Sequence, residues 1–197
     1  KELMYQGYTI QPYSPAAGTG LSSAEVNMEG CYQDVEDTTV VAQFKVSSSE
    51  FQNKWGIKGD VHILAWTTTP WTLPSNTALC VGPKIEYSLV KSFNQYPGDS
   101  IQVIIGSQLI EKQFSGKFFS VDSDYDLTYE EGDTKIPYYV DKKFFGSDLV
   151  GIRYEQLIKG CLPYQDAEKA FQVIKGDFVT TEDGTGIVPV SYTHLTL

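Results

Sequence analysis

The sequence has few of the features that mark membrane, secreted or metal-binding proteins. No window supplies the roughly 18 consecutive apolar residues that a membrane helix needs, and residues 1–14 lack the apolar centre of a signal peptide. The cysteines (Cys31, Cys80 and Cys161) are odd in number and never at CxxC spacing, so neither a disulfide framework nor a zinc site is predicted. We expect a protein of the reducing cytoplasm without a membrane partner.

Basic side chains are also scarce, because 15 Lys and Arg residues are outnumbered by 25 Asp and Glu residues, for a formal net charge of -10. Phosphate binding depends on clustered Lys and Arg, so this balance excludes a large nonspecific nucleic-acid surface. The acidity also has a simpler explanation, since net charge keeps proteins soluble. Any RNA contact is expected to be small or assisted.

Aromatic residues are abundant, with 13 Tyr and 10 Phe among 197 residues, as is typical of sheet-rich domains. Short strands separated by Gly, Pro and Asp turns are predicted at 40–46, 61–66, 87–90, 101–105, 171–174 and 187–190. A helix capped by Ser107 is expected to run to Phe114, and Asp166 is expected to cap a single turn, whereas the serines at 47–49 should begin a surface loop. We predict a mainly β fold with a few short helices, arranged as a closed or partly open β-barrel.

The first 30 residues differ in composition from the rest. Residues 11–23 are rich in Gly, Pro and Ser, which indicates an extended lead-in rather than a core. Gly18-Thr19-Gly20 lacks the rest of a dinucleotide fingerprint and is expected to be only a turn. We predict a lead-in at 1–30 and a folded domain at 31–188.

The most informative segment is 66–76, WTTTPWTLPSN, which directly follows an apolar run. Side chains alternate across a strand, so Thr67, Thr68 and Thr69 cannot all point into the core, and one or two must face a cleft or solvent. The two prolines fix φ and stiffen the turn that follows. Such a row of hydroxyls can position an ester, a ribose or an attacking water. The alternative is an ordinary, satisfied β edge.

No nucleophile triad or metal site is evident. Neither His62 nor His194 forms a recognisable triad with a Ser or Cys, so a positioned water is favoured over covalent catalysis. The acidic runs at 122–126 and 130–133 do not match a calcium-binding loop and are expected to be solvated. No metal ligand is predicted.

A second informative segment is 180–188, TTEDGTGIV. Asp183 and Gly184 predict a turn, and Gly186 leaves room for a ligand or another strand to approach the backbone. Gly184-Thr185-Gly186 lacks the third glycine and the downstream acid of a dinucleotide fingerprint. An ordinary tight hairpin remains the alternative.

Together these segments resemble the editing insertion of isoleucyl-tRNA synthetases. WTTTPWTLPSN is similar to the threonine-rich peptide of that family, and it carries Thr69-Pro70-Trp71 where the valyl and leucyl enzymes have an Arg after the paired threonines. Further similar segments are 12–15, 18–23, 32–40, 146–154 and 177–188. The resemblance therefore covers nearly the whole chain to Val188.

This resemblance implies an editing-domain barrel of the kind shared by valyl-, isoleucyl- and leucyl-tRNA synthetases. Such a domain hydrolyses valine wrongly attached to isoleucine tRNA and forms the second, smaller sieve of a double-sieve mechanism. The implied catalytic residues are Thr67, Thr68 and Thr69. The implied substrate-binding residues are Trp71 and Asn76, which support or border the site, and Thr185 and Gly186, which form its facing wall.

The implied partners are the 3' end of tRNA(Ile) carrying valine and the rest of the synthetase in the same chain, and a monomer is expected. No cofactor is expected for editing, whereas the parent enzyme would use ATP and Mg to ligate isoleucine to tRNA. The sequence contains neither the HIGH-type nor the KMSKS-type signature for ATP, so we expect this chain not to charge tRNA by itself.

The sequence departs from the family pattern after Val188. The family continues with a His and, further on, an Asp that holds the α-ammonium of the substrate by charge. Here Pro189 occupies the His position and the Asp is absent, so we predict that 189–197 is a non-native tail and do not treat His194 as a substitute. The alternative function is a catalytically silent fragment that binds tRNA or an amino acid.

Overall fold

A computed structural model of the chain describes residues 7, 9–94, 96, 98–130, 133–160, 162–163 and 166–191. Cys161 and His194 lie outside the described residues. The chain forms two compact units, residues 1–37 and residues 38–197. The domain boundaries predicted at residues 30 and 188 stay predictions.

The first unit contains an antiparallel hairpin of two short strands, β1 (Tyr13–Ser14) and β2 (Thr19–Gly20), followed by the 3-10 helix η1 (Glu25–Asn27). The chain reverses between the strands, where Gly18 takes a left-handed φ of 68°. Glycine adopts this conformation without steric cost. The turn predicted at residues 18–20 is therefore confirmed for Gly18, whereas Thr19 and Gly20 belong to β2.

The second unit is mainly β with a few short helices, as predicted. Its strands are β3 (Val40–Lys45), β4 (His62–Thr67), β5 (Asn76–Val81), β6 (Glu86–Phe93), β7 (Ser100–Gly106), β8 (Phe118–Ser120), β9 (Ile136–Phe145), β10 (Gln172–Lys175) and β11 (Ile187–Ser191). Its helical segments are α1 (Ser49–Trp55), η2 (Pro70–Ser75), η3 (Ser107–Leu109), α2 (Ile110–Gln113), η4 (Asp124–Asp126), α3 (Gly146–Leu149) and η5 (Ala167–Lys169). Within the described part of the chain, no helix is long and apolar enough to cross a membrane.

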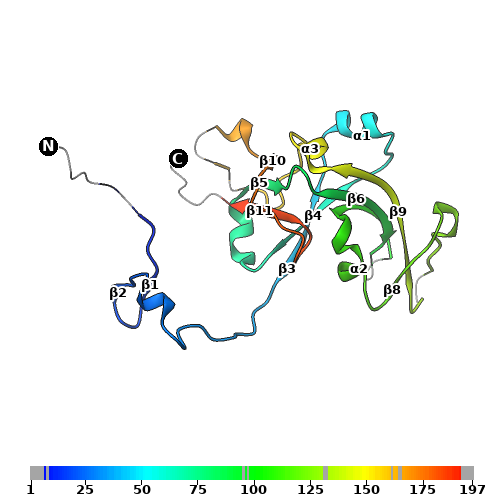
Figure 1. The fold of residues 1–197 in the computed structure, drawn as a ribbon. Coiled ribbons are helices and arrows are strands. Elements are labelled where there is room, and N and C mark those ends of the chain that lie inside the picture. The colour runs from blue at the N-terminus through cyan, green and yellow to red at the C-terminus, as the bar shows by residue number, and fades with distance from the viewer. Residues whose placement is uncertain are drawn as a thin grey trace. The chain divides into compact units, whose positions relative to one another are not determined.

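The strands of this unit form a six-stranded sheet in the order β3-β4-β7-β6-β9-β8 and a three-stranded sheet in the order β10-β5-β11 (Figure 1). Backbone hydrogen bonds join the two sheets at two places. Residues 151–155 bond to the end of β3 and to β10, and the N–H of Gly106 at the end of β7 donates to the carbonyl of Thr185 over 2.9 Å. The sheets therefore curve around a common interior as a partly open barrel, which confirms the predicted fold class.

Alternation along the strands fills this interior with apolar side chains from both sheets. Those buried here include Ala42, Phe44, Ile63, Ala65, Leu79, Val81, Tyr87, Leu89, Ile104, Val173 and Ile187. A second cluster, with Leu64, Val90, Val103, Ile105, Leu109, Ile110 and Phe114, packs η3 and α2 on the opposite face of the large sheet. The central strands are thus buried on both faces, which explains their nearly continuous apolar runs.

The serines at 47–49 do not begin a surface loop, contrary to expectation. Ser48 is extended and precedes α1, and the helix ends at Gly56 with a left-handed φ of 62°. Gly56 donates its N–H to carbonyls of the last helical turn, which is a common helix ending. A short polar helix between two apolar strands therefore stands where the composition suggested a loop.

The predicted caps of the later helical segments differ in detail. Gly106 rather than Ser107 precedes η3, and the Ser107 hydroxyl instead lies 2.8 Å from the hydroxyl of Ser88. Asp166 precedes η5 as expected, but its carboxylate accepts from Lys169 over 2.9 Å and makes no hydrogen bond to the helix backbone. Both segments are therefore helical where predicted, but the predicted side chains do not cap them.

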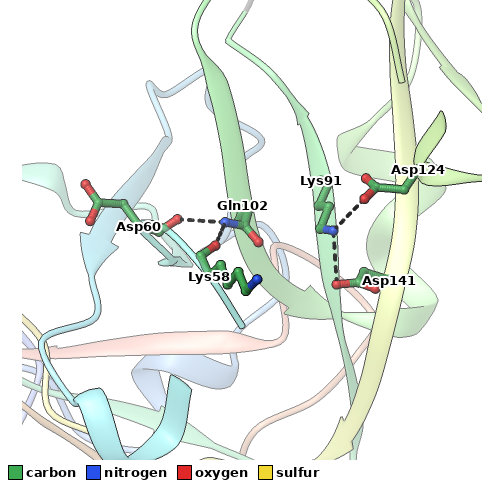
Figure 2. A network of polar contacts seen from close by, with 6 residues as sticks. All are labelled: Lys58, Asp60, Lys91, Gln102, Asp124 and Asp141. Atoms are coloured by element: carbon green, nitrogen blue, oxygen red, sulfur yellow. Dashed lines mark hydrogen bonds and ion pairs between the residues drawn. The ribbon is translucent and has the colours of Figure 1, made fainter. Parts of the chain in front are cut away.

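Part of the first acidic run is tied to the sheet. Asp124 in η4 and Asp141 in β9 both pair with the ammonium of Lys91 on β6, over 3.1 and 3.4 Å (Figure 2). Partial burial lowers the pKa of Lys91, but the bonds to these carboxylates outweigh burial and the net pKa is raised. Figure 2 also shows Gln102 of β7 donating to the carbonyl of Lys58 over 2.6 Å, ahead of β4.

Candidate functional site

Strand β4 carries the threonine peptide to the end of the barrel interior. Thr67, the last residue of β4, points to the same side as Ile63 and Ala65 and is 8% exposed, whereas Thr68 and Thr69 are exposed. The predicted division of the threonines between core and surface is therefore confirmed. Strand β4 lies between β3 and β7, but it pairs with β7 only at His62 and Ile63. At Thr67 it pairs with β3 alone, so a satisfied sheet edge remains the alternative interpretation of this peptide.

The hydroxyls of this peptide form a connected chain. Thr67 Oγ1 accepts from the backbone N–H of Thr69 over 3.0 Å and lies 3.3 Å from Thr69 Oγ1. Thr69 Oγ1 lies 3.4 Å from Thr72 Oγ1, and the Thr72 hydroxyl donates to the carbonyl of Thr69 over 2.8 Å. Such a chain can orient a water or an ester oxygen without placing a charge in the site.

Thr72 is a residue of this chain of hydroxyls that the sequence analysis did not single out. Pro70 begins the 3-10 helix η2, and residues three apart eclipse one another in a 3-10 helix. The hydroxyl of Thr72 therefore lies beside that of Thr69, one turn of the 3-10 helix earlier. The signal in the sequence was a threonine three residues after Thr69 across a proline.

The loop 184–186 lies directly against the strand that bears the threonines. Gly184 has a φ of 72°, and a Cβ at this position would lie 2.6 Å from the ring of Trp66. Gly186 also has a φ of 72°, and its backbone closely approaches that of Gly106. The structure thus brings together the two segments that the sequence singled out, while the catalytic and binding roles of their residues stay predictions.

The loop 180–188 is not a tight hairpin, so that alternative is wrong. Strands β10 and β11 both pair with β5, one parallel and one antiparallel, and not with each other. Asp183 forms an ion pair with Lys112 in α2, and Gln113 Nε2 donates to the carbonyl of Gly184 over 3.0 Å. The loop is therefore anchored on α2, on the outer face of the large sheet.

Thr185 and Trp71 differ in their exposure to solvent. Thr185 is 1% exposed, and its hydroxyl donates to the carbonyl of Ile187 over 3.3 Å. Trp71, in η2, is 68% exposed and offers its ring to solvent. The side chain of Thr185 is therefore enclosed in the fold, whereas the ring of Trp71 is open to solvent.

Asn76 is 4% exposed, and every polar atom of its amide group bonds within the protein. Its Nδ2 donates to the carbonyls of Ala78 and Val190 over 2.9 and 3.1 Å, and its Oδ1 accepts from the Tyr154 hydroxyl over 2.7 Å. Burial raises the pKa of Tyr154 well above its usual range, which keeps that hydroxyl a donor. Asn76 thus joins β5, β11 and the segment of Tyr154, and its role in the site stays a prediction.

No described histidine serves the threonines as a base. His62 belongs to β4, but its side chain lies on the face opposite that of Thr67, at the other end of the strand. Burial lowers the pKa of His62, and its Nδ1 has no hydrogen-bond partner among the described residues. Pro189, at the position of the family's His, lies in β11 opposite Leu79 and carries no titratable group.

Among the described residues, His, Cys, Asp and Glu form no group that could hold a metal ion. Of the cysteines, Cys80 is buried in β5 and free, and Cys31 is exposed and free. Burial raises the pKa of Cys80, which keeps its thiol protonated.

Comparison with known proteins gives no matching family model for this chain. The isoleucine--tRNA ligase of Bacteroides fragilis is 54% identical over 194 residues, and that of Porphyromonas gingivalis is 53% identical over 193 residues. In both cases the match covers 98% of this chain and 16% of the relative. The chain thus spans about 16% of the length of the curated relatives it matches.

Among solved structures, the editing domain of the P. knowlesi cytosolic leucyl-tRNA synthetase is similar, with a TM-score of 0.51 and 14% identity over 77% of this chain and 55% of that chain. The corresponding P. falciparum domain gives a TM-score of 0.50 and 15% identity over 77% of this chain and 60% of that chain. At these identities the likeness shows the fold. The chain is therefore related, over nearly its whole length, to a segment of the isoleucine--tRNA ligase family, and this segment has the fold of a synthetase editing domain.

Proposed function

We propose that this chain hydrolyses valine from mischarged valyl-tRNA(Ile) and so acts as the second sieve of an isoleucine--tRNA ligase. The observation that supports the proposal is the connected set of hydroxyls of Thr67, Thr69 and Thr72 at the end of β4, on a chain with the fold of an editing domain. Because one methylene is worth only about 1–3 kcal/mol in a binding pocket, a second, size-selective site is needed to remove valine.

In the proposed reaction, a water attacks the carbonyl carbon of the aminoacyl ester. The bond from this carbon to the ribose oxygen breaks, the ribose oxygen takes up a proton, and free valine and uncharged tRNA are released. Thr67, Thr69 and Thr72 orient the water and the ester through their connected hydroxyls. These hydroxyls and nearby backbone groups stabilise the negative charge that develops on the carbonyl oxygen of the ester.

Selection by size follows from the stiffness of the walls. Pro70 and Pro74 restrict η2, and Gly184 is pressed against Trp66, the residue before Thr67. Thr185 and Gly186 continue this wall, and Trp71 borders the opening. In this proposal, the site bounded by these residues admits the side chain of valine and rejects the additional methylene of isoleucine.

The activities of the whole enzyme are part of the same proposal, because the chain spans only 16% of its curated relatives. The parent would ligate isoleucine to tRNA with ATP and Mg, in the cytoplasm and as a monomer. The proposed partners of this segment are the 3' end of tRNA(Ile) and the rest of the synthetase.

A catalytically silent binding fragment is the second candidate function, and Pro189 is the observation that favours it. Where the family has a His, β11 has a half-buried proline that can neither donate nor accept a proton. On this view the chain still binds the amino acid or the tRNA end but hydrolyses the ester slowly or not at all.

Deacylation of valyl-tRNA(Ile) and isoleucyl-tRNA(Ile) by the chain tests the proposal. We expect valyl-tRNA(Ile) to be hydrolysed at least tenfold faster, and EDTA to leave the rate unchanged. Equal rates on the two substrates would remove the sieve, and loss of activity with EDTA would contradict a mechanism that relies on these residues alone.

Substitution at position 189 separates the two candidates. Pro189→His should raise the rate on valyl-tRNA(Ile) at least tenfold, whereas Val188→His, at the exposed neighbouring position, should not. The absence of hydrolysis in the unaltered chain and in both variants would favour the silent fragment.

A further inference from the structure

Each of the three carbonyls of the loop 184–186 accepts a hydrogen bond from a different donor. The carbonyl of Gly184 accepts from the side-chain amide of Gln113 over 3.0 Å. The carbonyl of Thr185 accepts from the N–H of Gly106 over 2.9 Å. These donors come from α2 and from the end of β7, so the first two peptide units of the wall are fixed to different elements.

The third carbonyl is held by a buried side chain. The hydroxyl of Tyr87, on β6, donates to the carbonyl of Gly186 over 2.7 Å and accepts from the N–H of Gly82 over 3.0 Å. Tyr87 is 0% exposed, so water does not compete for either bond. Since Gly82 follows β5 and Gly186 precedes β11, one hydroxyl fixes two strands of the small sheet to the large sheet.

Glycines leave the space that the Tyr87 ring fills. A Cβ at Gly146 would lie 3.1 Å from Cε2 of the ring, and a Cβ at Gly186 would lie 3.7 Å from Cε1. Gly106 is the strand partner of Tyr87 across β6 and β7. A ring enclosed by backbone in this way cannot turn without moving the strands, so its hydroxyl has a single position.

We propose that Tyr87 is the positioning residue of the pocket wall: it fixes the carbonyl of Gly186 and thereby sets how far the wall stands from the threonine peptide. The effect on selectivity rests on the proposed editing function, whereas the hold on the loop does not. Burial raises the pKa of Tyr87 to about 12, so its hydroxyl remains a donor throughout the physiological range.

The substitution Tyr87→Phe tests this proposal, because it removes the hydroxyl and keeps the ring. Ser92→Ala is the matched control: Ser92 is also 0% exposed, and its hydroxyl also donates to a backbone carbonyl, that of Pro137, over 2.8 Å. Both changes leave a buried carbonyl without its donor, but the control acts at the pairing of β6 with β9 and not at the loop.

Amide hydrogen exchange of the whole chain gives the first measurement. We expect exchange of residues 184–187 to become at least tenfold faster in Tyr87→Phe and to stay unchanged in Ser92→Ala. Incorporation of 3-fluorotyrosine at position 87, which keeps both ring and hydroxyl, should preserve slow exchange. Unchanged exchange in Tyr87→Phe, or an equal rise in both substituted chains, would overturn the hold of Tyr87 on the loop.

The ratio of valyl- to isoleucyl-tRNA(Ile) hydrolysis gives the second measurement. It should fall at least fivefold in Tyr87→Phe and not in Ser92→Ala, because simple loss of folded protein lowers both rates by one factor. An unchanged ratio in an active variant would overturn the role in selectivity and leave the editing function standing. An unaltered chain without hydrolysis would instead refute the editing function, and hydrogen exchange would still decide whether Tyr87 holds the loop.

Discussion

A single buried amide, that of Asn76, connects parts of the barrel that are far apart in the sequence. It bonds to Val190 across 114 positions and to Tyr154 across 78 positions. Buried amides of this kind organise a fold because each unmet partner is costly in a medium without water. The position of η2, and with it of the threonine peptide, depends on this connection because Asn76 directly follows η2.

We expect Asn76→Ala to lower the free energy of unfolding by about 2–4 kcal/mol, because the Ala78 and Val190 carbonyls and the Tyr154 hydroxyl would lose their partner. Urea denaturation followed by circular dichroism measures this change. The exposed neighbour Ser75 provides the control, and Ser75→Ala should stay within about 0.5 kcal/mol. A loss below about 1 kcal/mol for Asn76→Ala would contradict the role described here.

Tyr87 predicts a dependence of stability on alkaline pH. Its pKa is about 12 in the fold against 10.0 as the ordinary value, so above pH 10 the unfolded chain loses a proton that the folded chain retains. The stabilisation is complete below pH 10 and is lost as the pH rises towards 12, by about 2–3 kcal/mol. Denaturation between pH 9 and pH 12 should therefore show a shallower decline for Tyr87→Phe than for the unaltered chain, and parallel curves would refute this.

At the scale of elements, the contact between β4 and the loop before β11 depends on Gly184. A side chain there would meet the ring of Trp66 and would also have to adopt a φ of 72°. Gly116 has a similar φ of 69°, but no atom lies within 4 Å of a Cβ built there. The two glycines therefore separate the cost of the backbone conformation from the cost of the contact.

We expect Gly184→Ala to destabilise the chain by about 1–3 kcal/mol more than Gly116→Ala, because only Gly184 packs against an aromatic ring. Thermal denaturation measures the difference, and a change in the near-ultraviolet circular dichroism of tryptophan should accompany Gly184→Ala alone. Equal destabilisation by the two substitutions would mean that the loop does not pack on Trp66.

The elements that the sequence predicted correctly are those with local apolar runs, such as β4 and β7. Strand β9 was not predicted, because its outer positions carry charges whose partners appear only in the sheet: Lys143 pairs with Glu86, and Asp141 pairs with Lys91. Cross-strand pairs of this kind stabilise a sheet but weaken the alternating pattern in the sequence. Strand β5 was also not predicted, since its first residues, Asn76 and Thr77, are polar and leave only a short apolar run.

In the candidate site, too, features within a short stretch of sequence were predicted, whereas contacts between residues far apart in the sequence were not. The threonine peptide was recognisable from its own residues, and Thr72 could have been added from its spacing. The contact of Trp66 with Gly184 and the bond of Tyr87 to Gly186, 99 positions away, depend on how the two sheets come together. No pattern within a short window predicts such a bond, so Tyr87 could only be recognised in the structure.

At the scale of the whole molecule, the buried clusters belong entirely to the second unit, from Ala42 to Ile187. Removal of residues 1–37 should therefore leave the urea midpoint and its cooperativity nearly unchanged, within about 1 kcal/mol in the free energy of unfolding. Comparative denaturation of the full and shortened chains checks this. A larger loss, or a broad transition in the shortened chain, would show that the second unit depends on the first.

Pro189 has a consequence for how copies of this chain meet in concentrated solution. It lies in β11, which forms one margin of the three-stranded sheet, and proline has no N–H to donate. A strand of a neighbouring molecule that paired with β11 would lack one backbone hydrogen bond at Pro189, which disfavours fibril-like growth from this margin. Pro189 thus makes this margin of the sheet less able to pair with a strand of another molecule.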